Sequence, residues 1–189
     1  MGGKVADTAG ITLERDDTAT KNILEQVKIL ESQGYEFEGA DASLELIMRK
    51  AIGTYRHFFT THAFHTHINY SANGDRTLSE ATIKIELPDG QIMHTVAEGD
   101  GPVDALNMAL RKSLEPIYPE LGDVHLDDYK VRILDGQLAT QAKTRVLIES
   151  SDADQSWSTV GVSENIISAS YRALVDSIEY KLLRTRGHG

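Results

Sequence analysis

Hydrophobic and polar positions change from a helical to a strand-like spacing near residue 55. Between residues 16 and 53, apolar side chains recur three or four positions apart, as on one face of an α-helix. They form two stripes: Ile23, Leu24, Val27 and Leu30, then Leu44, Ile47, Met48 and Ala51. Asp41 suits the N-cap of the second helix, and Gly34 and Gly53 suit the two helix ends. Two such short helices cannot bury their stripes alone, so the pattern predicts that they pack on the rest of the chain.

After Tyr55 the apolar residues alternate with polar ones, which is typical of β-strands. In the first predicted strand, Phe58, Phe64, Ile68 and Tyr70 share one face, and His57, His65, His67 and Asn69 share the other. A second strand has Ile83, Ile85 and Leu87 on its apolar face. The sequence PDG at 88–90 predicts a turn into a third strand at 91–97. A helix follows, with Gly101 as its cap and Pro102 at its first position.

The same order of elements then occurs a second time. Tyr129, Val131 and Ile133 alternate in a strand, further strands follow around 146–148 and 157–162, and a helix ends the chain. The two helices align at an offset of 64, with Ala105, Ala109, Leu110 and Ser113 on Ala169, Ala173, Leu174 and Ser177. The middle strands align at an offset of 61, with Ala81 on Ala142, Ile85 on Val146 and Leu87 on Ile148. The sequence therefore predicts an α+β fold of two pseudo-symmetric, duplicated βββα units, preceded by a small helical linker subdomain.

Composition and charge narrow the range of functions. The 189 residues carry a formal net charge of −10 and no cysteine. Such a charge repels nucleic acid and anionic lipid, so we expect neither as a partner. The absence of cysteine excludes disulfides and thiolate chemistry and fits a reducing, cytoplasmic location. The first ten residues have neither the charge nor the apolar run of a signal peptide, and we interpret them as a linker within a longer polypeptide.

Two motifs suggest ligand binding at first reading. The stretch VGVSENIISASYRALVDSI at 160–178 joins a strand to a helix through a small polar turn, as phosphate-binding loops do. It lacks the lysine of a P-loop, so we interpret the turn as a helix cap. His65 and His67 share a strand face on which His57 or His94 could complete a metal site, but no third ligand is defined by the sequence. We therefore predict no metal site and no catalytic residue in this chain.

Four stretches resemble the C-terminal half of enzymes of the citramalate synthase and 2-isopropylmalate synthase family. They are GYEFEGADASLELIMRKA, AEGDGPVDALNMALRKSLEPIYPEL, DYKVRIL and WSTVGVSENIISASYRALVDSIEYKL. The resemblance covers residues 10–183, and GPVDAL and WSTVGVSENI are its most specific parts. In this family a (β/α)8 barrel condenses acetyl-CoA with a 2-oxo acid, and a helical linker and a regulatory domain of two βββα units follow.

The resemblance implies a domain organisation and a role. We expect a linker at residues 1–10, a helical linker subdomain at 11–54, a regulatory domain at 55–183 with repeats at about 55–119 and 120–183, and a tail at 184–189. The barrel, which holds the family's divalent metal partly through an H-x-H motif, has no counterpart here. His65 and His67 imitate that motif without its following Asn-Asp. We therefore expect no cofactor and no activity in this chain alone, but binding of an end-product branched-chain amino acid and formation of a homodimer.

The effector is expected near the segment LDGQLATQA at 134–142. An amino acid needs an acceptor for its ammonium, donors for its carboxylate and a small apolar pocket for its side chain. Asp135 supplies an acceptor, Gly136 allows close backbone approach, and Leu134, Ala139 and Ala142 supply apolar walls; Thr140 is a further candidate contact. The resemblance places the effector around this segment, and pseudo-symmetry adds Tyr70, Ser79 and Ala81 from the first repeat.

Two questions stay open at this stage. The effector is isoleucine if the parent enzyme makes citramalate, or leucine if it makes isopropylmalate. A pocket distinguishes such closely related side chains by only about 1–3 kcal/mol of binding free energy. The alternative function is a dimerisation module that binds no ligand. An enzyme that uses the histidine face with a metal is a third reading.

Overall fold

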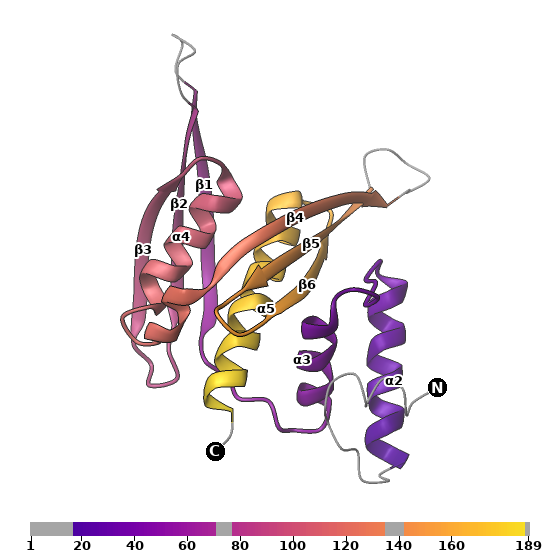
Figure 1. Ribbon diagram of the computed structural model, residues 1–189. Helices are drawn as coiled ribbons and strands as arrows, with labels where there is room; N and C mark the ends of the chain where they lie inside the picture. The colour runs from indigo at the N-terminus through magenta and orange to yellow at the C-terminus, as the bar shows by residue number, and fades with distance from the viewer. Residues whose placement is uncertain (1–16, 71–76, 135–141, 188–189) are drawn as a thin grey trace. The chain divides into compact units, whose positions relative to one another are not determined.

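The computed structural model describes residues 17–70, 77–134 and 142–187 (Figure 1). The helical segment contains α2 (Asp17–Ser32) and α3 (Asp41–Ala51). The first repeat contains β1 (Thr60–Tyr70), β2 (Thr77–Glu86), β3 (Ile92–Gly99) and α4 (Pro102–Leu114), followed by the short 3-10 helix η1 (Pro119–Asp123). The second contains β4 (His125–Leu134), β5 (Lys143–Ser151), β6 (Ser156–Ser163) and α5 (Ile166–Arg186). Residues 57–124 form one compact unit, and the other described residues form a second.

The unit of residues 57–124 is a three-stranded antiparallel sheet of order β1-β2-β3 with α4 packed on one face (Figure 1). Its core lies between the middle strand and the helix. The fully buried members of that core include Ala81, Ile83, Ile85, Ala105, Leu106, Ala109, Leu110 and Leu114. The predicted turn is present, with Gly90 at φ +85° and its N–H bonded to the Leu87 carbonyl. The alternation of β2 and the start of α4 at Pro102 are thus confirmed.

The second sheet has the order β4-β5-β6 and is covered by α5 on one face (Figure 1). Val146 and Ile148 are buried beneath the helix. The Trp157 Nε1–H donates to Ser177 Oγ at 3.0 Å, and Thr159 Oγ1 donates to the Ala173 carbonyl at 2.8 Å. Strand and helix therefore contact closely, and each unit is the βββα arrangement that the sequence predicted.

The helices repeat as predicted, but the middle strands do not. In every pair of helix residues that the offset of 64 aligns, both residues are buried, as Ala105 and Ala169 are. The strand offset of 61 is wrong, because Ala81 lies opposite Ala97 in its ladder while Val146 lies opposite Gly161. Ala81 and Val146 are therefore equivalent, which is an offset of 65 rather than 61. An even shift keeps the same side chains on the same face, so alternation alone cannot detect it.

The helical segment packs on the second repeat, as the exposed stripes of two short helices required. The connection between α2 and α3 supplies Phe37 and Ala40, which form a buried cluster with Val160 of β6. Partly buried residues surround that cluster: Val27, Leu30, Tyr35, Leu44, Ile47 and Leu147. Gly34 and Gly53 have positive φ, which explains why glycine follows each helix.

Three details of the helical segment differ from the sequence prediction. The N-cap of α3 is Ala40, and Asp41 lies in the first turn instead. Leu24 of α2 is 39% exposed rather than buried. The side chains that α3 buries most deeply include Ser43 and Leu46, on a different face from the expected stripe. The reason is that α3 contacts α2, α5 and β6, so it is covered on more than one side.

The two outer strands β1 and β4 are less covered than their apolar patterns predicted. Ile68 is 60% exposed and Ile133 is 69% exposed, although each points to the helix-covered side of its sheet. Each helix lies mainly over the middle strand and the opposite edge strand, β3 or β6, so β1 and β4 are covered least. Near its start β1 also has a register irregularity, between Thr61 and Ala63, and β4 has one at the equivalent place. The duplication thus includes the irregularity.

Candidate functional site

The predicted effector segment connects β4 to β5 in the second repeat. Of its proposed residues, Asp135, Gly136, Ala139 and Thr140 lie outside the described part of the chain. Of the predicted effector segment, the structure therefore describes only the first and last residues. Leu134 is the last residue of β4, and Ala142 directly precedes β5.

On the sheet face away from α5, the site is attached to the connection between α2 and α3. A Cβ atom at Gly34 would lie 2.5 Å from Leu134 Cδ1, and Gly34 has φ +106°. Only glycine fits this contact without strain. The Arg145 Nε–H donates to the Gly34 carbonyl at 2.7 Å, and Lys143 Nζ donates to the Gln33 carbonyl at 3.1 Å. The helical segment is thus hydrogen-bonded to β5 and lies against the last residue of β4, the two strands that flank the predicted effector segment.

On the face toward α5, the same strand end carries exposed apolar side chains. Val131 is 42% exposed, Ile133 69% and Ile166 of α5 42%. Tyr129 Oη is 2.8 Å from Ser170 Oγ, and Ser170 lies one turn after Ile166 on the same side of α5. We call Val131, Ile133 and Ile166 the β4–α5 apolar surface. It offers apolar contact to a branched side chain next to the predicted segment.

The N-terminus of α5 is occupied by its own cap. Asn165 is the N-cap residue, and its side chain accepts hydrogen bonds from the N–H groups of Ile167 at 2.8 Å and Ser168 at 3.1 Å. Two of the donors that a phosphate would need are therefore already bonded. The interpretation of this turn as a helix cap is confirmed.

The candidates from the first repeat belong to the other compact unit. Ser79 and Ala81 are fully buried on β2, on the side of the sheet that faces α4. Tyr70 ends β1, and its side chain is not among those described. Because the corrected offset pairs Ala81 with Val146 rather than with Ala142, the pseudo-symmetry argument for these residues is weakened. A role for Tyr70, Ser79 and Ala81 in effector binding stays a prediction.

The histidines of β1 are exposed on the face away from α4. His67 lies opposite Glu80, and Glu80 lies opposite Glu98 on the neighbouring strand. His62, near the irregularity, is 2.6 Å from Glu86 Oε2. Within residues 17–70, 77–134 and 142–187, no three histidine or carboxylate side chains are placed to hold one metal ion.

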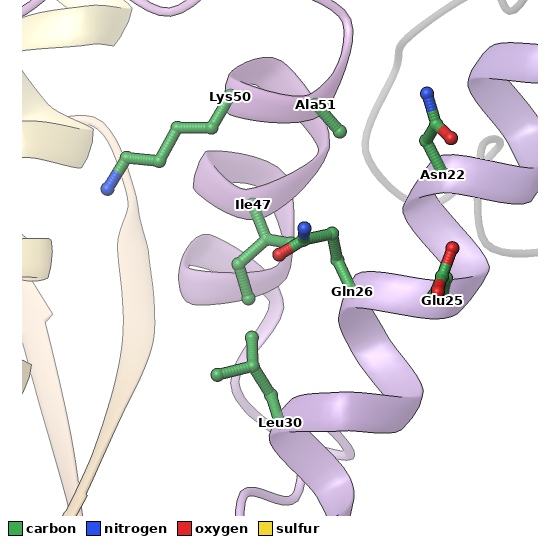
Figure 2. A pocket seen from close by; sticks show the side chains of 7 residues that line it. All are labelled: Asn22, Glu25, Gln26, Leu30, Ile47, Lys50 and Ala51. Carbon is green, nitrogen blue, oxygen red and sulfur yellow. The ribbon is translucent and has the colours of Figure 1, made fainter.

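Two cavities of the second unit were not indicated by the sequence. One of about 430 Å³ lies between α2 and α3 and includes Gln26, Leu30 and Ile47 (Figure 2). The other, of about 260 Å³, lies beside the predicted segment and is lined by Lys143, Glu164 and Arg172 among others. Its two cations are suited to bind the carboxylate of an amino acid, and its carboxylate is suited to bind the ammonium group. They come from distant parts of the chain, so no local motif could have identified them.

Two βββα units, with a helical segment packed on the second, form a small α+β domain. Residues 38–182 match the LeuA allosteric (dimerisation) domain family, and the chain belongs to this family. The family resemblance found in the sequence is therefore confirmed.

The part of the chain that the structure describes contains no helix long and apolar enough to cross a membrane.

Similar proteins carry this domain within longer chains. The chain is 51% identical over 177 residues to an (R)-citramalate synthase of Geobacter sulfurreducens, covering 94% of this chain and 33% of the relative. It is 49% identical over 180 residues to an (R)-citramalate synthase of Synechocystis sp., with 94% and 33% covered. A 2-isopropylmalate synthase of Aquifex aeolicus is 33% identical over 112 residues, with 59% and 20% covered. The chain thus spans about a third of the length of the citramalate synthases it matches.

Proposed function

We propose that this chain is the allosteric regulatory domain of an acyltransferase that condenses acetyl-CoA with a 2-oxo acid. In this proposal it binds an end-product branched-chain amino acid and holds two subunits together as a homodimer. Citramalate synthases are the relatives matched over nearly the whole chain, which favours isoleucine over leucine as the effector. The parent enzyme is expected to be cytoplasmic, with its divalent metal in the catalytic barrel.

The observation that carries the effector proposal is the arrangement around the β4–β5 connection. The β4–α5 apolar surface includes Ile133 near the end of β4, and the cavity with Lys143, Glu164 and Arg172 includes the first residue of β5. Apolar walls beside charges of both signs suit a zwitterion with a branched side chain. The hydrogen bond from Arg145 of β5 to the Gly34 carbonyl supports a regulatory role, because it links the strand that follows the β4–β5 connection to the helical segment.

A melting experiment separates effector binding from the alternative, a dimerisation module without a ligand. The single tryptophan, Trp157, is buried under α5 in the unit that carries the site, so its fluorescence reports the unfolding of that unit. An effector at a hundredfold excess over its Kd stabilises the folded state by about 2.7 kcal/mol. Isoleucine, leucine and valine are compared, with glycine as the control amino acid. If none of them raises the melting temperature, the chain is a ligand-free module.

Exposed apolar side chains support the homodimer. Ile68 and Ile133 occupy equivalent positions at the ends of β1 and β4, and both are more than half exposed. Isoleucines so exposed on two sheets are suited to contact with a second copy. Light scattering at micromolar concentration is expected to give twice 20.8 kDa. A monomer mass under these conditions contradicts the dimer.

A further inference from the structure

Helix α3 contacts the second repeat through a buried hydroxyl group. Ser43 is 1% exposed, and its Oγ donates to Asp176 Oδ2 of α5 at 2.7 Å. The same oxygen accepts the N–H of Val160 at 3.0 Å. Val160 belongs to β6, an edge strand, and its N–H is bonded to Ser43 outside the sheet, so Ser43 supplies the partner that a buried N–H needs. Ser43 thus joins α3 to a helix and to a sheet edge at once.

A second carboxylate lies beside the first. Glu179 follows Asp176 by three positions on α5, so both side chains face the same way, and Glu179 is 4% exposed. Lys50 Nζ of α3 is 3.6 Å from Glu179 Oε2, and it lies 4.6 Å from the centre of the Tyr55 ring. Tyr55 is in turn hydrogen-bonded to Glu179. Two acids of α5 are therefore held against α3 beside one ammonium group, which is itself 47% exposed.

The contact is electrostatically unbalanced when both acids are ionised. Asp176 is partly exposed, unlike Ser43 and Glu179, yet the burial that it has raises its pKa to about 6; the negative charge of Glu179 adds to this, while the Ser43 hydrogen bond and the Lys50 charge oppose it. Burial and the charge of Glu179 likewise raise the pKa of Tyr55. A carboxyl whose pKa is raised in the packed state stabilises packing fully below its ordinary pKa near 3.8, and this contribution is lost as pH rises through about 6.

We propose that the contact between α3 and α5 is a proton-sensitive joint, in which α3 separates from α5 more readily once Asp176 loses its proton beside the buried Glu179, while the second βββα repeat stays folded. The groups that face Asp176 are Ser43 and Lys50 of α3, Tyr55 after α3, and Glu179 of α5. Since α3 follows the connection that contacts Leu134 and Arg145, the joint determines how firmly the helical segment is held beside the β4–β5 connection.

Hydrogen–deuterium exchange on the whole chain tests the joint. Exchange is followed by mass spectrometry for peptides covering residues 43–51, with β5 as the internal reference, from pH 5 to pH 8 after correction for intrinsic rates. If separation returns Asp176 to its ordinary pKa, the linkage relation gives about a tenfold loss of α3 protection between pH 5 and pH 7. Protection of β5 should stay constant over the same range.

Variants show which group is responsible. Asp176→Asn keeps the size of the side chain and an acceptor for Ser43, and it should leave α3 at least as protected at pH 7 as the parent is at pH 5. Ser43→Ala should lower protection of α3 at every pH, because the Val160 N–H loses its partner. Asp41→Asn, which removes an exposed charge from the same helix, is the matched control and should keep the pH dependence.

Two results overturn the proposal. One is protection of α3 that does not change with pH in the parent chain. The other is a pH dependence that persists in Asp176→Asn. No amino acid is added and no second subunit is needed, so failure here leaves the effector and homodimer proposals untouched.

Discussion

The contact between Gly34 and Leu134 gives the sharpest test of how the helical segment is attached to the predicted effector segment. In Gly34→Ala the new methyl group would lie 2.5 Å from Leu134 Cδ1, at a residue with φ +106°. A positive φ costs a residue with a side chain about 1–2 kcal/mol, and overpacking costs about 1–3 kcal/mol more. The free energy of unfolding should therefore fall by about 2–5 kcal/mol.

The matched control is Gly39→Ala in the same connection. Gly39 has φ +77° and would place its methyl group in open space, so it has the backbone strain without the clash. Its expected cost is about 1–2 kcal/mol. Because the two φ values differ, a double-mutant cycle isolates the clash. Leu134→Val removes the Cδ atoms, and in the Gly34→Ala background it should recover at least about 1 kcal/mol relative to its effect in the parent.

Urea unfolding followed by Trp157 fluorescence measures these free energies in the unit that contains both residues. The reasoning is refuted if Gly34→Ala costs no more than Gly39→Ala. It is also refuted if the coupling between Gly34 and Leu134 is below about 0.5 kcal/mol, which is the usual limit for independent sites.

Four further predictions concern the site, the helix cap, a buried ion pair and catalysis. Gly136→Val and Ala139→Phe should each abolish the melting shift caused by isoleucine or leucine, because they fill the expected pocket; unchanged binding would place the site elsewhere. Asn165→Ala should lower the free energy of unfolding by about 0.5–2 kcal/mol, since two N–H groups lose their acceptor. Burial alone would raise the pKa of Asp152, but hydrogen bonds from Lys181 and two backbone N–H groups hold this pKa below its usual range. The stability that ionised Asp152 contributes should therefore be lost as pH falls below about 4. Lys181→Met should lower the free energy of unfolding by about 3 kcal/mol at pH 7 and by less at pH 3. Finally, the chain alone should release no CoA from acetyl-CoA with pyruvate or 2-oxoisovalerate and a divalent metal, and turnover would show that the active site has been misplaced.

The sequence by itself determined the features that depend on local chemistry and on repetition. Pro102 at the start of α4, the turn at Gly90 and the small residues of both helices, such as Ala109 and Ala173, could be read directly. Each follows from a backbone preference or from the close approach of a helix to a sheet. The duplication was visible for the same reason, because both helices present small side chains at three matched positions and leucine at a fourth.

Only the tertiary structure decided the strand register and what each surface covers. A shift of four residues leaves every side chain of β5 on its own face, so the alignment of Ala81 with Ala142 could not be rejected from the pattern. Whether Ile133 is buried depends on how far α5 reaches across the sheet, and the burial of Ser43 depends on a β6 edge far along the chain. Alternation and helical spacing report which side chains share a face, and only the packing of distant elements determines which faces are covered.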